Sequence, residues 1–376
     1  MPRLTRRWLL RNDDRGGVMA IVAILLAGGV LMGSGALAID VGRLYVEREQ
    51  LQSGADGAAM AVAKECASNV TSCGADPDGT AKGFADGNAE DDVSGVNVLC
   101  GDAPSGALPA CPAPSTTLSR CMTDPPGDDV PYVEVRTQTE SDGGSTLLPP
   151  TFAQLLLGNE GYEGSTVGAC ARAAWGPPAS AAGLAVTMSA CEWEASTAGG
   201  TSYAPPPPYP PNPLPAASTE QVLYLHTTTG KEPTCPAGPS GADAPGGFGW
   251  LDESGECTAT VEADGTYGGD PGASASTACK DALESSRTNK TLVFVPVFDA
   301  VEGTGSGTTY HIKGMAALVL TGYNLPGLRE PSWLTGTKYC KGSDKCLYGY
   351  FTQGLVPASG VIGGPDLGAS IVALVG

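Results

Sequence analysis

The sequence is poor in positive charge and in histidine. Its 376 residues include 21 lysines and arginines against 40 aspartates and glutamates, and only two histidines. An acidic surface repels phosphate, which argues against nucleic acid as a partner. Two histidines are also too few to explain the 12 cysteines as zinc ligands. Paired disulfides in an oxidising compartment explain them better.

Motifs of the common catalytic sites are missing as well. Neither G-x-S-x-G, H-E-x-x-H nor a phosphate-binding loop occurs, and Gly303-Thr-Gly-Ser-Gly lacks the Lys-Ser/Thr that would complete the last of these. His226 and His311 fall in predicted strands, where a packed or surface imidazole is the simpler interpretation. We therefore predict no enzyme activity, cofactor or metal site. Because carboxylates are plentiful, an exported hydrolase that uses two acids stays open as an alternative.

One stretch, residues 18–39, lacks charge altogether. A helix rises ~1.5 Å per residue, so this run covers roughly 33 Å, enough to cross a bilayer. The leader before it, residues 1–17, contains five arginines and two aspartates, whereas the whole chain has a formal net charge of −19. Positive flanks stay in the cytoplasm. The predicted location is the cell membrane, with a single span, a cytoplasmic N-terminus and the bulk of the chain outside.

A cleaved signal peptide is the competing interpretation of this run. Ala36-Leu37-Ala38 fits the A-x-A cleavage rule, although the apolar run is longer than the ~7–15 residues usual for a signal peptide. Cleavage would release the outer part of the chain. The sequence leaves both outcomes open, and either one exports most of the protein.

The cysteines fall into two groups of six on either side of Trp175-Gly-Pro-Pro. With 53 glycines and 31 prolines, much of the chain is predicted to be turn and loop, so cross-links would supply rigidity that the apolar core does not. We expect intramolecular disulfides segregated in the same way, with connectivity undetermined. The candidate disulfide cysteines are Cys66, Cys73, Cys100, Cys111, Cys121 and Cys170, then Cys191, Cys235, Cys257, Cys279, Cys340 and Cys346.

The helical pattern continues past the apolar run without a proline, which predicts one long helix over residues 17–66. Residues 40–66 would form its projecting amphipathic part. Apolar and small side chains recur there at spacings of three, four and seven, on one side of the helix. This stripe packs on the protein's own outer domain or docks neighbouring subunits. The candidate docking face comprises Leu44, Leu51, Ala55, Ala58, Ala59 and Val62.

These residues also carry a family resemblance. In order, the chain shows Arg15-Gly16, the apolar span, Asp40, Gly42-Arg43, Leu51-Gln52 and Ala55-Asp56, followed by Ala58 to Ala63. This ordered set resembles the N-terminal module of TadE/TadG-like Flp (tight-adherence) pilus-assembly proteins. The resemblance implies a membrane-anchored pilus component whose partners are other pilus-assembly proteins or pilin-like helices.

Two features depart from that family's pattern. Prepilin peptidase substrates of this group carry Glu five residues after the cleaved glycine, but Val22 occupies that position after Gly17. Longer TadG-type members can carry an Asp-x-Ser-x-Ser metal site, whereas the acid that follows a predicted strand here, Asp299, has no such serines. Neither pilin processing nor a metal-dependent adhesion site is therefore carried over.

The remaining chain divides into two predicted regions. Residues 67–180 form a small α+β unit, with helices over 80–89 and 149–157 and strands over 130–139 and 164–175. Residues 181–376 form a β-rich, disulfide-containing domain. Its predicted strands cover 184–189, 221–228, 291–301, 310–321 and 369–375, and a proline-rich segment at 204–215 is read as a rigid connector or surface loop rather than a ligand.

The predicted fold class is accordingly α+β: a single N-terminal transmembrane helix that continues into a long helix, followed by disulfide-stapled, β-rich extracytoplasmic domains. The predicted function is a membrane-anchored component of Flp/Tad-type pilus assembly that acts through protein–protein contacts outside the membrane. The main alternative is a secreted or surface-held adhesin or binding module, released by cleavage near Ala38.

Overall fold

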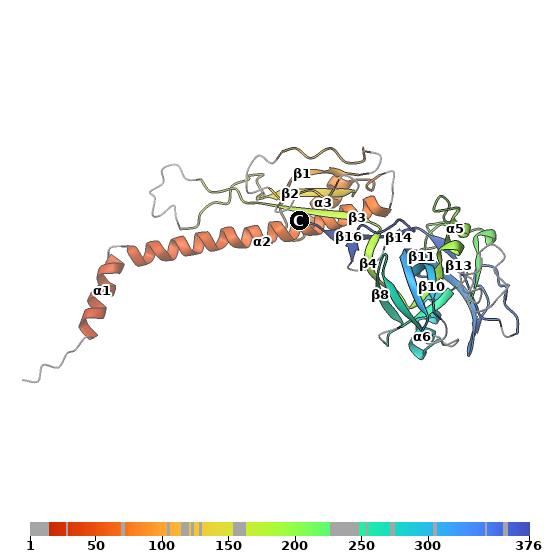
Figure 1. Ribbon diagram of the computed structural model, residues 1–376. Helices are drawn as coiled ribbons and strands as arrows, with labels where there is room; N and C mark the ends of the chain where they lie inside the picture. Colours follow the sequence, from red (N-terminus) through yellow and green to blue (C-terminus); the bar gives the residue numbers. More distant parts are fainter. Residues whose placement is uncertain are drawn as a thin grey trace, which may run out of the picture.

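In the computed structural model, a long helical stalk leads into two β-rich units (Figure 1). The structure describes residues 15–376 apart from 28, 69–71, 104–105, 114–119, 122–123, 128–129, 153–162, 226–247, 253–254, 271–274, 304–306, 343 and 356–359. Most of the leader and His226 thus lie outside the described residues. The predicted mixture of helix and strand, with β-rich units and several disulfides, is confirmed.

The stalk consists of two helices, α1 (Arg15–Ala27) and α2 (Val30–Ser68). The prediction of one unbroken helix over residues 17–66 is wrong, because Gly29 adopts a left-handed φ of +70° between the two helices. Large apolar side chains are exposed on both sides of this break, as on Ile24 and Leu37. Among the described residues, no helix has both the length and the apolar character that crossing a membrane requires.

A five-stranded sheet packs on the second half of α2. Its strands lie in the order β1-β2-β3-β16-β14, and the first three pair antiparallel. The short helix α3 joins α2 on the same face of the sheet, and the Asp76 side chain caps its first turn by accepting from Gly79 N. The bounds are β1 (Gly95–Asp102), β2 (Tyr132–Gln138), β3 (Gly168–Gly176), β16 (Ala369–Leu374), β14 (Gly354–Leu355) and α3 (Pro77–Asp86).

The second unit is built around an eight-stranded sheet and contains the largest core. Its strands lie in the order β10-β5-β7-β9-β11-β13-β6, with β12 beside β11, and a direct pairing of β10 with β11 closes the first five strands into a ring. The bounds are β5 (Val186–Ser189), β6 (Gln221–Tyr224), β7 (Phe248–Leu251), β9 (Thr266–Asp270), β10 (Leu292–Glu302), β11 (Thr309–Leu325), β12 (Leu328–Glu330) and β13 (Cys346–Thr352).

A smaller sheet and two helices complete this unit. The sheet has the order β15-β4-β8, from β4 (Pro178–Leu184), β8 (Thr258–Glu262) and β15 (Val361–Ile362). The helices are α5 (Ala190–Thr197) and α6 (Thr277–Asn289), and a 3-10 turn covers Ala217–Thr219. Helix α6 was not predicted from the sequence. The Ser276 side chain caps it, and it buries Cys279 and Leu283 on the core.

The C-terminal strand crosses between the two units. Residues 369–375 are predicted to belong to the second region, but β16 pairs antiparallel with β3 of the first sheet. Its side chains alternate between two cores: Ile371 packs in the core of the second unit and Val372 against the core of the first. A strand with two apolar faces can join two sheets, because successive side chains point to opposite sides.

Two other predicted segments can be compared with the structure. The expected helix over 149–157 falls mainly outside the described residues, and the part that is described, 149–152, is not helical. The proline-rich segment folds against its own unit: the Tyr209 hydroxyl lies 2.6 Å from that of Tyr350 on β13 and donates to Pro205 O at 2.6 Å. It is thus a packed surface loop, one of the two roles considered for it.

Five disulfides join described cysteines, and each stays within one half of the cysteine set. The pairs are Cys66–Cys73, Cys100–Cys111, Cys121–Cys170, Cys257–Cys279 and Cys340–Cys346. Cys191 is disulfide-bonded as well, and Cys235 lies outside the described residues. Some of these bonds have a short sequence separation, such as the seven residues of Cys66–Cys73, and close local loops.

Candidate functional site: the junction of stalk and first sheet

The small residues of α2 form its contact with the sheet. Ala55, Ala58, Ala59 and Val62 are each 0% exposed and share one core with side chains of β2 and β3. Small side chains allow a helix to approach a sheet closely, and their burial offsets the weak helix propensity of the neighbouring glycines. The sheet residues in this core are Val133, Val135, Ala171, Ala173 and Trp175.

The candidate docking face is therefore occupied within the chain itself. Leu51 is 3% exposed and packs with Val167 and Ala169, and the half-buried Leu44 lies against the same cluster. Of the two roles considered for this stripe, the structure places it on the protein's own domain. A neighbouring helix has no access to Ala58 in this arrangement.

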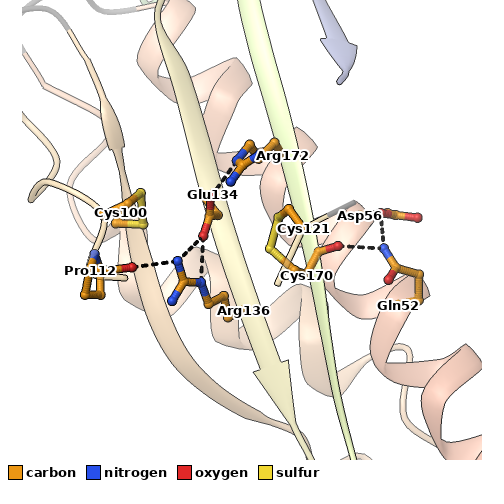
Figure 2. Close-up of a disulfide and its surroundings, with 10 residues drawn as sticks. Gln52, Asp56, Cys100, Pro112, Cys121, Glu134, Arg136, Cys170 and Arg172 are labelled. Atoms are coloured by element: carbon orange, nitrogen blue, oxygen red, sulfur yellow. Dashed lines mark hydrogen bonds and ion pairs between the residues drawn. A yellow bond between two sulfur atoms is a disulfide. The ribbon is translucent and has the colours of Figure 1, made fainter. Parts of the chain in front are cut away.

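Polar residues of the family pattern strengthen the same contact. Gln52 Nε2 donates to the Cys170 carbonyl oxygen of β3 at 3.0 Å and to Asp56 Oδ1 at 2.9 Å (Figure 2). The Thr137 hydroxyl of β2 donates to the Leu51 carbonyl oxygen at 2.9 Å. Helix and sheet are thus held in register by hydrogen bonds as well as by apolar burial.

A second polar contact lies nearer the apolar run, where α2 leaves the sheet. The Asp40 carboxylate accepts from the backbone N–H groups of Thr151, at 2.8 Å, and Phe152, at 3.1 Å. Arg43 Nη1 donates to the Thr151 hydroxyl and to the Pro149 carbonyl oxygen, at 3.4 Å for the latter. Asp40 and Arg43 of the family pattern thus bind one short loop, residues 149–152, which we call the tip loop.

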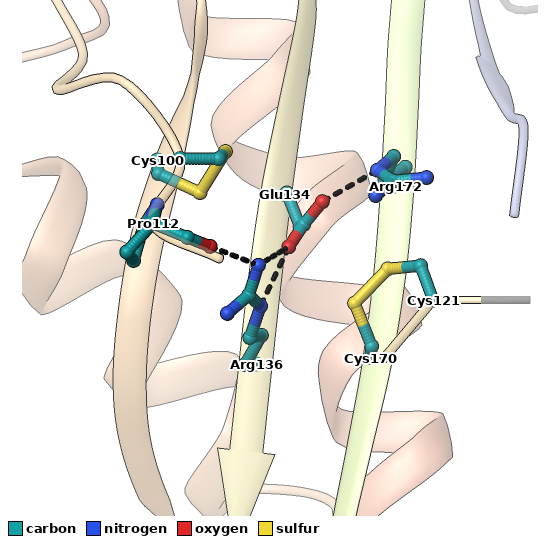
Figure 3. Close-up of polar contacts among 8 residues, drawn as sticks. Cys100, Pro112, Cys121, Glu134, Arg136, Cys170 and Arg172 are labelled. Carbon is teal, nitrogen blue, oxygen red and sulfur yellow. Dashed lines mark hydrogen bonds and ion pairs between the residues drawn. A yellow bond between two sulfur atoms is a disulfide. The ribbon is translucent and has the colours of Figure 1, made fainter. Parts of the chain in front are cut away.

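The outer face of the first sheet carries a buried charge cluster. Glu134 on β2 is 1% exposed and accepts from Arg136 Nε at 2.6 Å and from Arg172 Nε, on β3, at 2.5 Å (Figure 3). Arg136 also donates to the Pro112 carbonyl oxygen at 2.8 Å. One carboxylate thus pairs with two guanidinium groups, and such charge-assisted bonds are stronger than neutral ones.

Two disulfides frame this cluster and tie down the segment that covers it. Cys100 on β1 bonds Cys111, and Cys170 on β3 bonds Cys121, so the described parts of the segment between β1 and β2 are attached to the strands on either side of β2 (Figures 2 and 3). A cavity of about 650 Å³ remains between this segment and the sheet. Its lining includes Tyr132, Glu134, Arg136, Arg172, Leu108 and Pro112.

The chemistry open to this cluster is limited by the bonds it already makes. In the described chain, sulfur and carboxylate atoms gather in two places, Cys100/Cys111/Glu134 and Cys121/Cys170/Glu134. The sulfurs of both groups are in disulfides, and a metal needs thiolates. The Glu134 carboxylate is held by both arginines. The cluster therefore acts as a structural tie.

The strand predicted over residues 130–139 gave no sign that its charges are buried. Glu134 and Arg136 are both nearly fully buried in the structure. The available signal was the opposite charge at i and i+2 in one strand, which puts Glu134 and Arg136 on the same face. Nothing in the pattern showed that the segment after β1 folds over them.

In the second unit, two polar groups stand out. Glu220 accepts from the hydroxyls of Ser332 at 2.5 Å, Thr335 at 3.0 Å and Tyr339 at 2.7 Å, and from Thr321 as well. His311 Nδ1 lies 2.7 Å from Asp299 Oδ1 on the adjacent strand, and this hydrogen bond raises the pKa of the imidazole. The Glu220 contacts fix the loop that follows β12.

The comparisons with known proteins agree with the sequence pattern of the stalk. No curated protein and no solved structure matches the chain. Residues 17–65, however, match the family model "Putative Flp pilus-assembly TadE/G-like", and this segment includes the helix stripe, Gln52 and the Asp40 and Arg43 contacts. The resemblance is thereby confirmed: residues 17–65 of this chain are similar to the TadE/G-like Flp pilus-assembly family.

Proposed function

We propose that the protein is a membrane-anchored component of Flp/Tad-type pilus assembly, which acts through protein–protein contacts outside the membrane. The observation that carries this proposal is the match of residues 17–65 to the pilus-assembly family. That segment is an integral part of the folded protein, because α2 supplies six of the fifteen buried residues in the core of the first unit. We call the two β-rich units together the head.

Exposure along the stalk supports the membrane anchor. Val18, Met19, Ile21 and Ile24 of α1 are 59–75% exposed, and Leu37 and Ile39 of α2 are 61% and 50% exposed. A contiguous apolar surface of this kind is costly in water and marks a membrane or protein contact. In this proposed function, α1 and the start of α2 act together as one span, with the arginines of the leader in the cytoplasm.

The partner surface must lie elsewhere than the small-residue stripe. On the stalk beyond Asp40, Tyr45 is 71% exposed and Val46 is 51% exposed. These side chains lie outside the proposed span and contact little of the head. We place contacts with other pilus-assembly proteins or pilin-like helices there.

The test combines fractionation with co-purification from a pilus-forming host. The full chain should stay in membranes after carbonate extraction and should co-purify with pilus-assembly proteins. Tyr45→Asp with Val46→Asp should abolish co-purification and pilus display, while unfolding stays unchanged. Lys64→Asp, an exposed change on the same helix, is the matched control. Pilus display that survives deletion of the whole gene would overturn the proposal.

N-terminal sequencing of the mature chain separates the anchored form from the released one. An intact N-terminus in the membrane fraction supports the anchor. A mature chain that begins at Ile39 and appears in the medium would contradict it and favour the secreted adhesin. Asp40 would survive that cleavage, so α2 would keep its contact with the tip loop.

A further inference from the structure

Residues 139–152 and 163–167, the described part of the chain between β2 and β3, leave the sheet as an arm that follows α2. Its two sides run together: Thr139 N donates to Val167 O at 2.9 Å, and Leu148 and Ser165 exchange backbone hydrogen bonds at 3.0 and 3.2 Å. Val167 at its base packs on Leu51, and Leu44 lies about two helical turns further along α2. Figure 1 shows this arm reaching along α2 away from the rest of the head.

The tip loop of the arm is fixed at the border of the apolar run. Ile39 is the last residue of that run, and Asp40, directly after it, binds the N–H groups of Thr151 and Phe152. Arg43 holds the Thr151 hydroxyl from the next turn of the helix. Two consecutive N–H donors on one carboxylate define the position of the loop closely.

The tip loop itself presents apolar groups. Pro149 and Phe152 are exposed, Phe152 to 38%, and Pro150 is half-buried. We propose that the arm is a second lipid contact, in which the Asp40–Arg43 clamp holds residues 149–152 at the bilayer surface with Phe152 in the headgroup region. This inference rests on the proposed membrane anchor, because it needs residues 18–39 to lie in the bilayer.

The geometry explains why a second contact matters. A single helix leaves the head free to swing about the point where the chain leaves the membrane. A second contact beside Asp40 fixes the angle of α2 to the membrane, and hence the direction in which the two β-rich units project. Aromatic side chains are favoured at the interface between lipid and water, which suits Phe152 to this role.

The test places a tryptophan in the tip loop of the full-length protein. Phe152→Trp is compared with the unsubstituted chain in nanodiscs of phosphatidylcholine and phosphatidylglycerol, whose acyl chains are either plain or brominated close to the headgroup. The added emission should be quenched in the brominated discs. Phe84→Trp is the matched control, since Phe84 is 49% exposed on α3, at the far end of α2 from the border. Its added emission should be unchanged.

A second substitution tests the clamp. Asp40→Ala in the Phe152→Trp chain should reduce the quenching, while urea unfolding of the head stays the same. Equal emission of Phe152→Trp in plain and brominated discs, from protein that has entered the discs, would overturn the second contact alone. Failure of the unsubstituted chain to enter discs would overturn the membrane anchor, and this inference with it.

Discussion

Glu134 links three parts of the first sheet through its side chain. Its two oxygens bind arginines on β2 and β3, and Arg136 in turn binds the segment tied down by the Cys100–Cys111 bond. Buried charges are tolerated only when paired and hydrogen-bonded, because desolvation penalises the charged form. Without the Glu134 carboxylate, two guanidinium groups would be buried with no opposite charge to compensate them, so the carboxylate matters for stability.

Glu134→Gln should therefore destabilise the protein strongly. The substitution leaves two buried arginines without their carboxylate, and breaking a buried ion pair costs about 3–5 kcal/mol. The control is Glu330→Gln, because Glu330 is 49% exposed and lies 3.7 Å from Arg287; a surface pair contributes about 0–1 kcal/mol. Urea unfolding measures both. Equal losses of unfolding free energy would show that the cluster is not effectively buried.

The hydrogen bond between His311 and Asp299 changes how the His311 imidazole titrates. The hydrogen bond to Asp299 raises the pKa of the imidazole, so Asp299→Asn should lower it toward the ordinary value of about 6.5. The ion pair stabilises the folded protein fully at pH values below the ordinary pKa of histidine, which applies to the unfolded chain. This stabilisation is lost as the pH rises through the raised pKa of His311 in the folded protein. Because both side chains are about 40% exposed, the change in stability should be small.

Proton NMR can follow this titration directly, since His226 is the only other histidine of the chain. The His311 signal is assigned with His311→Gln. If its pKa is the same with Asn at position 299, the pairing in the structure does not persist in solution.

The buried face of α2 could be predicted from the sequence, but the surface that covers it and the break at Gly29 could not. The spacing of Leu51, Ala55 and Ala58 predicted an amphipathic helix, and its apolar face is buried as a helix of that period requires. Periodicity identifies the buried face of a helix but not the surface that covers it. The sequence therefore could not decide whether this face packs on the protein's own domain or on a neighbouring subunit. The break at Gly29 was missed, because glycine in an apolar run is also compatible with a membrane helix.

Substitutions at two glycines of α2, Gly54 and Gly57, would measure how closely α3 packs against α2. A Cβ at Gly54 would lie 3.1 Å from the Ala85 carbonyl oxygen and 3.2 Å from its Cα, whereas at Gly57 the nearest atom would be 3.5 Å away. Alanine gains up to about 1 kcal/mol over glycine in a helix. Gly57→Ala should raise the free energy of unfolding, and Gly54→Ala should gain nothing or lower it. Thermal unfolding compares them; equal gains would mean that α3 moves aside easily.

Ala58→Leu tests the stripe as a packing surface. Ala58 is fully buried against the sheet, and overpacking a core typically costs about 1–3 kcal/mol. The melting temperature should fall, while Lys64→Leu, at an exposed position on the same helix, should leave it nearly unchanged. Lost pilus assembly with an unchanged melting temperature would instead favour docking of another helix on this face.

The two β-rich units are joined by strand pairing as well as by the chain that links them. The split of cysteines around Trp175 predicted separately stapled regions, and each disulfide between described residues stays within one half. Yet the last strand returns to the first sheet, and Trp193 Nε1 of the second unit donates to Leu367 O at 3.0 Å just before it. A seven-residue apolar segment indicates a strand but not the sheet that it joins, since long-range pairing leaves no local signal.

Ile371 should therefore couple the stabilities of the two units. Its side chain is fully buried in the second core while its backbone pairs with Gly176 of β3, so Ile371→Ala opens a cavity in one unit and loosens a strand of the other. Such truncations cost about 2–5 kcal/mol. Hydrogen exchange should accelerate in peptides from both β3 and β10. Leu283→Ala, a truncation in α6 of the same core, should accelerate exchange in the second unit alone. Exchange that speeds up only around β10 in the Ile371 variant would mean that the two units open independently.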